Sequence, residues 1–235
     1  MKALFAMDLM GGKTVRLKKG DFSAVTVYSN NPVEKIKDMV DRGARDFHII
    51  DLDGAREGFP VHFELIKRLR TEIKGYMEVG GGIRTKEDIK AYEDLGMDGI
   101  IVGTRPLEDM EFFKSLSSYR NIVLGLDVYN GKPMIKGWKE AVDIDLKDII
   151  TLSEEVGIKA LLCTAIARDG MLAGPDFEGL ERILNITRIP VIASGGVTTL
   201  EDIKRLKSMG VWATIIGKAF YEGLIRIEDV MGLVY

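Results

Sequence analysis

The sequence Met77-Glu78-Val79-Gly80-Gly81-Gly82-Ile83-Arg84-Thr85-Lys86-Glu87-Asp88-Ile89-Lys90 recurs later in the chain as Ile192-Ala193-Ser194-Gly195-Gly196-Val197-Thr198-Thr199-Leu200-Glu201-Asp202-Ile203-Lys204. The segment Val102-Gly103-Thr104 recurs at the same spacing as Ile216-Gly217-Lys218. Each copy contains an apolar run, a glycine turn, a helix-like segment with an acidic first turn, and a second apolar run that ends in glycine. Because this period is longer than the repeats of solenoid proteins, it predicts two fused halves, about residues 1–120 and 121–235.

Short apolar runs alternate with helix-like segments along the whole chain, which is typical of βαβ units and a parallel sheet. We expect strands at 3–7, 47–51, 76–79, 99–102, 122–127, 160–164, 190–193 and 213–216. We expect helices at 32–42, 60–73, 86–95, 108–117, 146–156, 175–185, 200–209 and 227–233. These units predict a single α/β domain over residues 1–235, a (β/α)8 TIM barrel whose two half-barrel repeats leave no exposed strand edge. A doubly wound open sheet is the alternative.

The composition favours a protein that acts on a small molecule. The 235 residues are 46% hydrophobic, and Lys+Arg 33 against Asp+Glu 36 give a net charge of −3. No long run of like charge is present, which argues against a partner that is nucleic acid or a membrane surface, and no apolar stretch approaches the roughly 20 residues of a membrane span. One cysteine and two histidines allow neither an internal disulfide nor a zinc constellation. We expect a cytoplasmic monomer without a metal site.

Aspartates end two of the expected strands, at the side of a barrel where active sites lie. Asp8 ends the first strand, and Asp127 ends the fifth, which opens the second half. They are therefore repeat partners on opposite sides of the mouth, suited to act as base and acid if their environments separate their pKa values. Capping of a turn is the structural alternative for each. Asp53-Gly54 after the second strand and Asp169-Gly170 after the sixth could both be simple turns, and Asp169 could instead be a third carboxylate over the pocket.

Two glycine clusters follow the strands on either side of the barrel. Backbone N–H groups freed by glycine beside a helix N-terminus form an anion site, and barrels often hold phosphate after strands seven and eight. Two equivalent clusters predict two phosphates, whereas tight turns without a ligand are the alternative. Neither cluster spells a dinucleotide-binding G-x-G-x-x-G. The candidate phosphate-binding residues are Gly81, Gly82, Gly103 and Thr104 in the first half, and Gly195, Gly196, Gly217 and Lys218 in the second.

Four other residues are weaker candidates. His48 lies within an apolar strand and His62 in the first turn of a helix, so a core or surface role is expected for both. Cys163 lies inside the sixth strand, where a buried and inert thiol is the default. Trp138 falls in the long segment after the fifth strand and is either a lid aromatic over a ligand or a packing anchor.

Several motifs, taken together in order and spacing, resemble those of the phosphoribosylformimino-5-aminoimidazole carboxamide ribotide isomerase family of histidine biosynthesis. The resemblance runs from Ala3 to Gly223. It rests on Asp8-Leu9, Gly12-Lys13, Val15-Arg16-Leu17, Gly20-Asp21-Phe22, Tyr28-Ser29, Asp51-Leu52-Asp53-Gly54-Ala55, Gly80-Gly81-Gly82-Ile83-Arg84, Gly125-Leu126-Asp127, Gly137-Trp138, Arg168-Asp169-Gly170, Gly174, Ala193-Ser194-Gly195-Gly196-Val197 and Gly217-Lys218-Ala219.

The resemblance implies a barrel without an organic cofactor that converts a bisphosphorylated aminoaldose to an aminoketose by an Amadori rearrangement. It implies that Asp8 takes the proton from the second ribose carbon, that Asp127 or Asp169 donates the proton that opens the ribose ring, and that Thr164 orients the substrate. The positions that it assigns to substrate binding are Arg16, Asp51, Arg84 and Trp138, and it adds Gly174 to the phosphate-binding set.

Two residues separate this chain from related families. Leu9 and Ala165 stand where the cyclase that acts next in the pathway has a cysteine and a serine, which disfavours that enzyme. Ala165 also departs from the isomerase family, which usually has a carboxylate there, so this chain would be slow or altered in its substrate if that group matters. The alternatives that remain are a bifunctional histidine and tryptophan pathway isomerase and a catalytically impaired phosphate-binding barrel.

Overall fold

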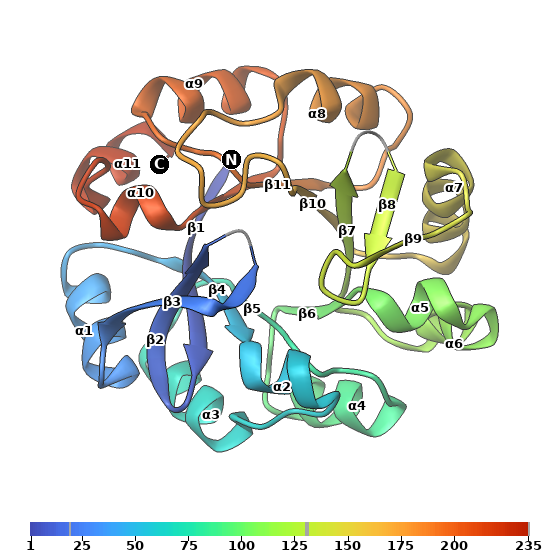
Figure 1. The fold of residues 1–235 in the computed structure, drawn as a ribbon, viewed down its shortest axis with the longest axis horizontal. Helices are drawn as coiled ribbons and strands as arrows, with labels where there is room; N and C mark the ends of the chain where they lie inside the picture. Colours follow the sequence, from blue (N-terminus) through green and yellow to red (C-terminus); the bar gives the residue numbers. More distant parts are fainter. Residues whose placement is uncertain (19, 130–131, 235) are drawn as a thin grey trace.

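The computed structural model describes residues 1–18, 20–129 and 132–234. Among these residues, eight parallel strands form a closed ring with helices around its outside, which is a (β/α)8 TIM barrel (Figure 1). Each ring strand overlaps a strand expected from the sequence, so the fold prediction is confirmed. The ring strands are β1 (Lys2–Met10), β4 (Asp46–Asp51), β5 (Met77–Gly80), β6 (Gly99–Val102), β7 (Ile122–Tyr129), β10 (Ala160–Ala165), β11 (Val191–Ser194) and β12 (Ala213–Ile216).

The ring follows the order of the chain, and every neighbouring pair of its strands is parallel. It closes where Lys2 of β1 pairs with Ala213 of β12. The two halves of the ring also meet on the other side of the barrel, where Val102 of β6 pairs with Leu124 of β7. Because each ring strand therefore has a neighbour on both sides, the open-sheet alternative is excluded.

Two of the outer helices begin with equivalent capping residues. In α4 (Lys86–Asp94) and α9 (Leu200–Ser208), a threonine and the aspartate three residues later form the same capping box, Thr85 with Asp88 and Thr199 with Asp202. The repeat in the sequence is thus also a repeat of local structure. The other outer helices are α1 (Pro32–Asp41), α3 (Phe63–Glu72), α6 (Met110–Ser115), α7 (Leu146–Val156), α8 (Phe177–Leu184) and α11 (Ile227–Val234), and the shorter ones are α2 (Leu52–Glu57), α5 (Thr104–Glu108), α10 (Lys218–Tyr221) and the 3₁₀ turn η1 (Leu116–Ser118).

Two expected helices have different bounds in the structure. The segment 108–117 is divided between α5 and α6, because the backbone at Asp109 is extended and its carboxylate caps α6 by accepting the Phe112 N–H. The helix expected from Pro60 begins only at Phe63. The preceding backbone is held as a loop, since the Asp51 carboxylate accepts its N–H groups.

An antiparallel excursion, not predicted from the sequence, follows the first strand of each half. β2 (Lys13–Lys18) and β3 (Asp21–Ser29) follow β1, and β8 (Lys132–Ile135) and β9 (Glu140–Ala141) follow β7. Since β2 pairs with the last residues of β1, the excursions stand at the carboxyl ends of the ring strands. The two meet there: a Cβ added to Gly20 would lie 2.9 Å from the Trp138 ring.

The buried apolar side chains form two layers. One fills the space between the ring and the helices and includes Phe5, Phe47 and Leu161. The other fills the barrel interior and includes Leu4, Val123 and Ile192. Because the interior is packed, a ligand site has to lie at an end of the barrel. None of the described helices is long and apolar enough to cross a membrane.

Candidate active site

Asp8 lies near the carboxyl end of β1, where β2 runs back along it. The residue is 9% exposed, and Arg16 of β2 donates a hydrogen bond from Nη1 to Asp8 Oδ2 at 2.9 Å. Burial raises the pKa of the Asp8 carboxyl, and the nearby positive charges of Arg16 and His48 only partly oppose this. A buried carboxylate with increased proton affinity at a barrel mouth is suited to act as a base.

Asp127 lies across the mouth on β7, level with Thr164 of β10. Burial raises the pKa of Asp127 to about 6, although hydrogen bonding from the Thr164 hydroxyl and the Trp138 indole N–H favours its charged form. The Trp138 ring, which sits between β8 and β9, thus reaches back from the excursion to this carboxylate. A carboxyl group with a pKa near 6 holds its proton at pH values where an ordinary aspartate has lost it, which suits a general acid.

Asp169 joins the two strand-end aspartates. It lies in the loop between β10 and α8, where its backbone N–H donates to the Ala165 carbonyl oxygen at 3.0 Å. Its charge raises the pKa of both Asp8 and Asp127, so it lies close enough to act on each of them. The structure therefore brings together over one mouth three carboxylates that lie far apart in the sequence.

Replacement of Asp127 by asparagine is expected to stabilise the protein at alkaline pH. The folded-state pKa of Asp127, about 6, exceeds the usual 3.8, so ionisation of this carboxyl is less favourable in the folded protein than in the unfolded chain. Ionisation therefore lowers the free energy of unfolding, and this destabilisation reaches its full size once the pH is above about 6. Asp127→Asn should therefore raise the free energy of unfolding by about 2–3 kcal/mol at pH 8 and by about half as much at pH 5. Urea unfolding at the two pH values measures this, and an equal effect at both would contradict it.

A buried polar network lies deeper in the barrel, below the aspartates. Glu78 of β5 is fully buried, its Oε1 lies 2.6 Å from His48 Nδ1 of β4, and its Oε2 accepts the Tyr76 hydroxyl at 3.0 Å. His48 is buried, in agreement with the core role expected from the sequence, whereas the burial of Glu78 was not predicted. The signal that could have identified Glu78 is an acidic residue on the interior face of an apolar strand. Such a charge is rarely buried without a partner, so it predicts a buried polar pair.

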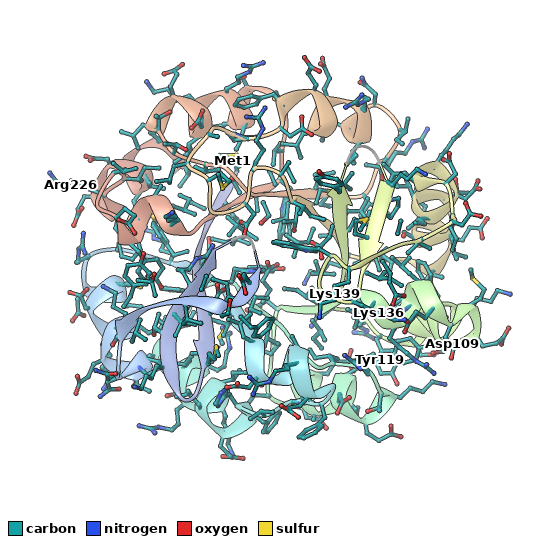
Figure 2. The ribbon with its side chains drawn as sticks, in the orientation of Figure 1. Met1, Asp109, Tyr119, Lys136, Lys139 and Arg226 are labelled. Carbon is teal, nitrogen blue, oxygen red and sulfur yellow. The ribbon has the colours of Figure 1, made fainter. Side chains whose placement is uncertain are left out.

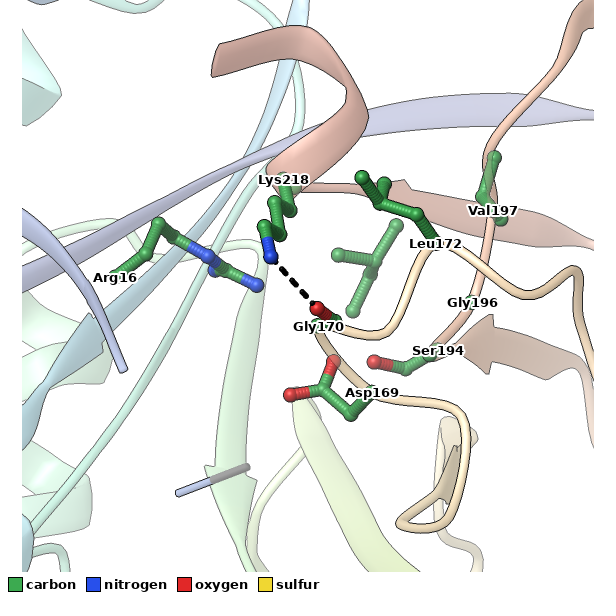
Figure 3. A pocket seen from close by; sticks show the side chains of 11 residues that line it. Arg16, Asp169, Gly170, Leu172, Ser194, Gly196, Val197 and Lys218 are labelled. Atoms are coloured by element: carbon green, nitrogen blue, oxygen red, sulfur yellow. Dashed lines mark hydrogen bonds between the residues drawn. The ribbon is translucent and has the colours of Figure 1, made fainter. Parts of the chain in front are cut away.

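The second glycine cluster forms the wall of a pocket beside Asp169. The pocket is lined by Arg16, Ser194, Gly195, Gly196, Gly217 and Lys218, together with the loop from Asp169 to Leu172 (Figure 3). Lys218 Nζ donates to the Gly170 carbonyl oxygen at 3.0 Å across it. A Cβ added to Gly217 would lie 2.6 Å from Arg16 Nη2, so the guanidinium rests directly on that backbone. The pocket thus combines exposed backbone with two cationic side chains.

Gly196 is required by packing as well as by any ligand. Its φ is +90°, and an added Cβ would overlap the carbonyl group of Gly174 in the facing loop. Gly174 therefore contributes to the site as a backbone neighbour of this cluster. A valine at 196 would disturb the loop itself, so loss of ligand binding in such a variant would not isolate an anion contact.

The first glycine cluster lies on the opposite side of the mouth. Gly103 caps α5, as Gly217 caps α10, and the Thr104 hydroxyl accepts the Lys136 N–H at 3.1 Å. Lys136 Nζ lies 3.2 Å from Glu108, so the β8–β9 excursion is anchored beside this cluster (Figure 2). Gly81 and Gly82 pack against the backbone around Asp51, Gly54 and Phe59.

Two expected substrate-binding residues differ in their surroundings. The Asp51 residue is fully buried, and its carboxylate accepts the backbone N–H groups of Gly54, Val61 and His62, so it holds the loop after β4. Arg84 is exposed and lies against Gly58 at the end of α2. His62 Nε2 lies 2.7 Å from Asp53 Oδ2, within the same loop.

Cys163 is buried, and burial raises the pKa of its thiol to about 12, as expected for an inert cysteine.

Comparison with known proteins identifies relatives along the whole chain. Residues 3–226 match the family model described as "Histidine biosynthesis protein". A protein of Halothermothrix orenii named 1-(5-phosphoribosyl)-5-((5-phosphoribosylamino)methylideneamino) imidazole-4-carboxamide isomerase is 43% identical over 231 residues, which cover 97% of this chain and 98% of the relative. Proteins of the same name from Aquifex aeolicus and Thermodesulfovibrio yellowstonii are 44% and 38% identical, over 96% and 100% of this chain and 95% and 97% of their own lengths. The chain therefore belongs to the histidine biosynthesis protein family.

Proposed function

We propose that this protein is an aldose–ketose isomerase of histidine biosynthesis, which acts on the bisphosphorylated aminoimidazole carboxamide ribonucleotide by an Amadori rearrangement. The observation that carries the proposal is the convergence of Asp8, Asp127 and Asp169 over one barrel mouth, between two glycine clusters. The name of the relatives includes two phosphoribosyl groups, which agrees with a site that has an anion cluster on each side. No metal ion or organic cofactor is part of this proposal.

The reaction requires one acid and one base. A proton donated to the ring oxygen breaks its bond to the first ribose carbon, and the nitrogen lone pair forms a C=N bond there. Removal of the proton from the second carbon then gives an enaminol, which becomes the ketone when the first carbon gains a proton and the hydroxyl group on the second carbon loses one. We assign the removal step to Asp8 and the donation step to Asp127 or Asp169, with Thr164 orienting the substrate between them.

The phosphates would occupy the two glycine clusters, one at each end of the substrate. Gly195, Gly196, Gly174, Gly217 and Lys218 form one site, with Arg16 beside it. Gly81, Gly82, Gly103 and Thr104 form the other. Trp138 would close over the substrate between them, and Arg84 would reach it from the first-half side. Asp51 supports this side from below through the loop that it holds.

The direct test is an assay of the purified protein with the bisphosphorylated aminoaldose, in which the product is followed through a coupled glutaminase-cyclase step. Turnover that disappears in the Asp8→Asn variant supports the proposal. Binding of the substrate without turnover would instead support the impaired phosphate-binding barrel. The one-phosphate substrate of the tryptophan pathway isomerase, offered in a parallel assay, tests whether the enzyme is bifunctional.

The pH profile is expected to separate the two candidate acids. If Asp127 donates the proton, kcat/KM should fall as the pH rises through about 6, because the protonated form of this carboxyl is lost there. In Asp127→Asn that alkaline limb should disappear and the remaining rate should be about 100-fold lower. A limb that persists in Asp127→Asn and disappears in Asp169→Asn would assign the acid to Asp169.

Ala165→Asp is expected to increase turnover severalfold without a change of fold. Ala165 ends β10 directly after Thr164 and is only half-buried, so a carboxylate there can be hydrated beside the site. Initial rates and the melting temperature measure the two effects. The matched control is Ala167→Asp, which adds the same charge at an exposed position of the same loop. A rate that stays flat or falls would mean that the alanine is neutral or compensated.

The proposal also includes a single-domain monomer that works in the cytoplasm and binds no nucleic acid. The nearly balanced charges and the one buried thiol support it. Sedimentation equilibrium would measure the mass in solution.

A further inference from the structure

Arg16 is in contact with two different parts of the mouth. One arm of its guanidinium donates from Nη1 to Asp8 Oδ2 at 2.9 Å. The other arm, Nη2, rests on Gly217 in the wall of the second-half pocket, which Arg16 itself lines. The side chain is only 13% exposed, so it stays within reach of both neighbours. A single planar cation therefore bridges the candidate base and the candidate anion pocket.

Lys218, the residue after Gly217, brings a second positive charge to the same pocket. Its ammonium donates to the Gly170 carbonyl oxygen at 3.0 Å, and Figure 3 shows it directed toward the Arg16 guanidinium. Two cations that converge in a half-buried space repel each other, and a doubly charged anion between them removes that repulsion. The pocket is therefore prepared for a dianion that would contact both side chains.

We propose that a phosphate bound in this pocket draws the Arg16 guanidinium away from Asp8, so that Asp8 becomes a stronger base when the pocket is occupied. The inference rests on the proposed role of Asp8 in the isomerase reaction. Through this coupling, a phosphate that lies far from the reacting carbons contributes to the chemical step. The binding energy of the remote group is used to prepare the base. Arg16 is then a positioning residue that acts through Asp8.

The other groups that face Asp8 allow this mechanism. They are His48 from β4, Asp169 from the loop after β10 and Tyr221 from α10. Loss of the Arg16 ion pair would remove the cation that is bound to Asp8, while Asp169 and the bound anion would both favour its protonated form. Each consequence of anion binding thus increases the proton affinity of Asp8.

The test measures the Asp8 carboxyl directly, by carbon NMR of the full-length protein labelled at the aspartate side-chain carboxyls. Sulfate serves as the probe because it stays a dianion throughout the titration, and sodium chloride of equal ionic strength is the control. Saturating sulfate should increase the proton affinity of Asp8 about tenfold in the wild-type protein. Arg16→Gln should begin with the higher affinity and gain less than about twofold from sulfate, and Arg16→Lys provides a second variant if Arg16→Gln does not fold.

Lys218→Met is the matched comparison within the pocket. It should require about tenfold more sulfate, yet reach the same Asp8 proton affinity at saturation, because the coupling runs through Arg16. The inference is overturned if sulfate raises the proton affinity equally in Arg16→Gln, if it fills the pocket without changing Asp8, or if the Gly196 and Gly217 amide signals show that it does not bind there.

A kinetic measurement connects the coupling to catalysis. A substrate analogue that lacks the phosphate of this pocket should be turned over faster by the wild type when inorganic phosphite is added, through kcat rather than KM, and Arg16→Gln should lose that activation. Coupling seen by NMR without isomerase activity would reject the proposed function alone. Isomerase activity without coupling would reject this inference alone.

Discussion

Asp8→Asn is expected to lower kcat by about 1,000-fold, because the carboxamide keeps the size of the side chain but has no basic oxygen with which to take a proton from carbon. The effect should appear in kcat more than in KM, since Asp8 lies near the end of β1 and the glycine clusters that would hold the substrate are intact. Steady-state kinetics with the aminoaldose measure both constants.

Two controls accompany this variant. Asp8→Glu keeps the carboxylate but moves it by one methylene, so part of the activity should remain. Urea unfolding of Asp8→Asn should show a protein at least as stable as the wild type at pH 8, since burial raises the pKa of this carboxyl and the ionised form is unfavourable in the folded state. A turnover within tenfold of wild type would remove Asp8 from the mechanism.

Gly81→Ala is expected to lower the free energy of unfolding by about 4 kcal/mol. The backbone at Gly81 has φ of +103°, which a residue with a Cβ adopts only under strain, and the added atom would overlap the Asp51 carbonyl group. Strain and overpacking each contribute about 1–3 kcal/mol. The midpoint of urea unfolding measures the loss.

Gly96→Ala is the matched control for backbone conformation. Gly96 also has a positive φ, of +76°, but an added Cβ there would meet no atom within 4 Å. Its loss should be about 1 kcal/mol, so the difference between the two variants isolates the close approach to Asp51. Equal losses would show that the packing around Gly81 relaxes.

The barrel could be predicted from the sequence because its signals are local and occur twice. Apolar runs such as Ala213–Ile216 are buried on both faces, and the Thr85 and Thr199 capping boxes mark the start of equivalent helices. The antiparallel excursions were missed because β2 and β3 carry polar residues at many positions and depend on pairing with β1 and each other rather than on a buried apolar face.

The candidate site was predicted in its residue types but not in its contacts. Asp8 and Asp127 follow from their equivalent places at strand ends, whereas the bond from Arg16 to Asp8 depends on a hairpin that the sequence did not reveal. Glu78 and His48 lie at paired positions of neighbouring strands, so their interaction follows only once the register is known. Asp51 was expected to bind substrate. Its contacts are instead made with the backbone of the loop after β4, which closes around its carboxylate.

The pairing of Lys2 with Ala213 joins the first ring strand to the last, and this has a consequence during synthesis of the protein. As the chain leaves the ribosome, β1 can pair with β4 early, but its other edge stays open until nearly all of the chain has been made. An open strand edge is a template for pairing with other chains, and closing so long a loop is slow. Until β12 has been made, this edge of β1 is therefore open to pairing with other chains.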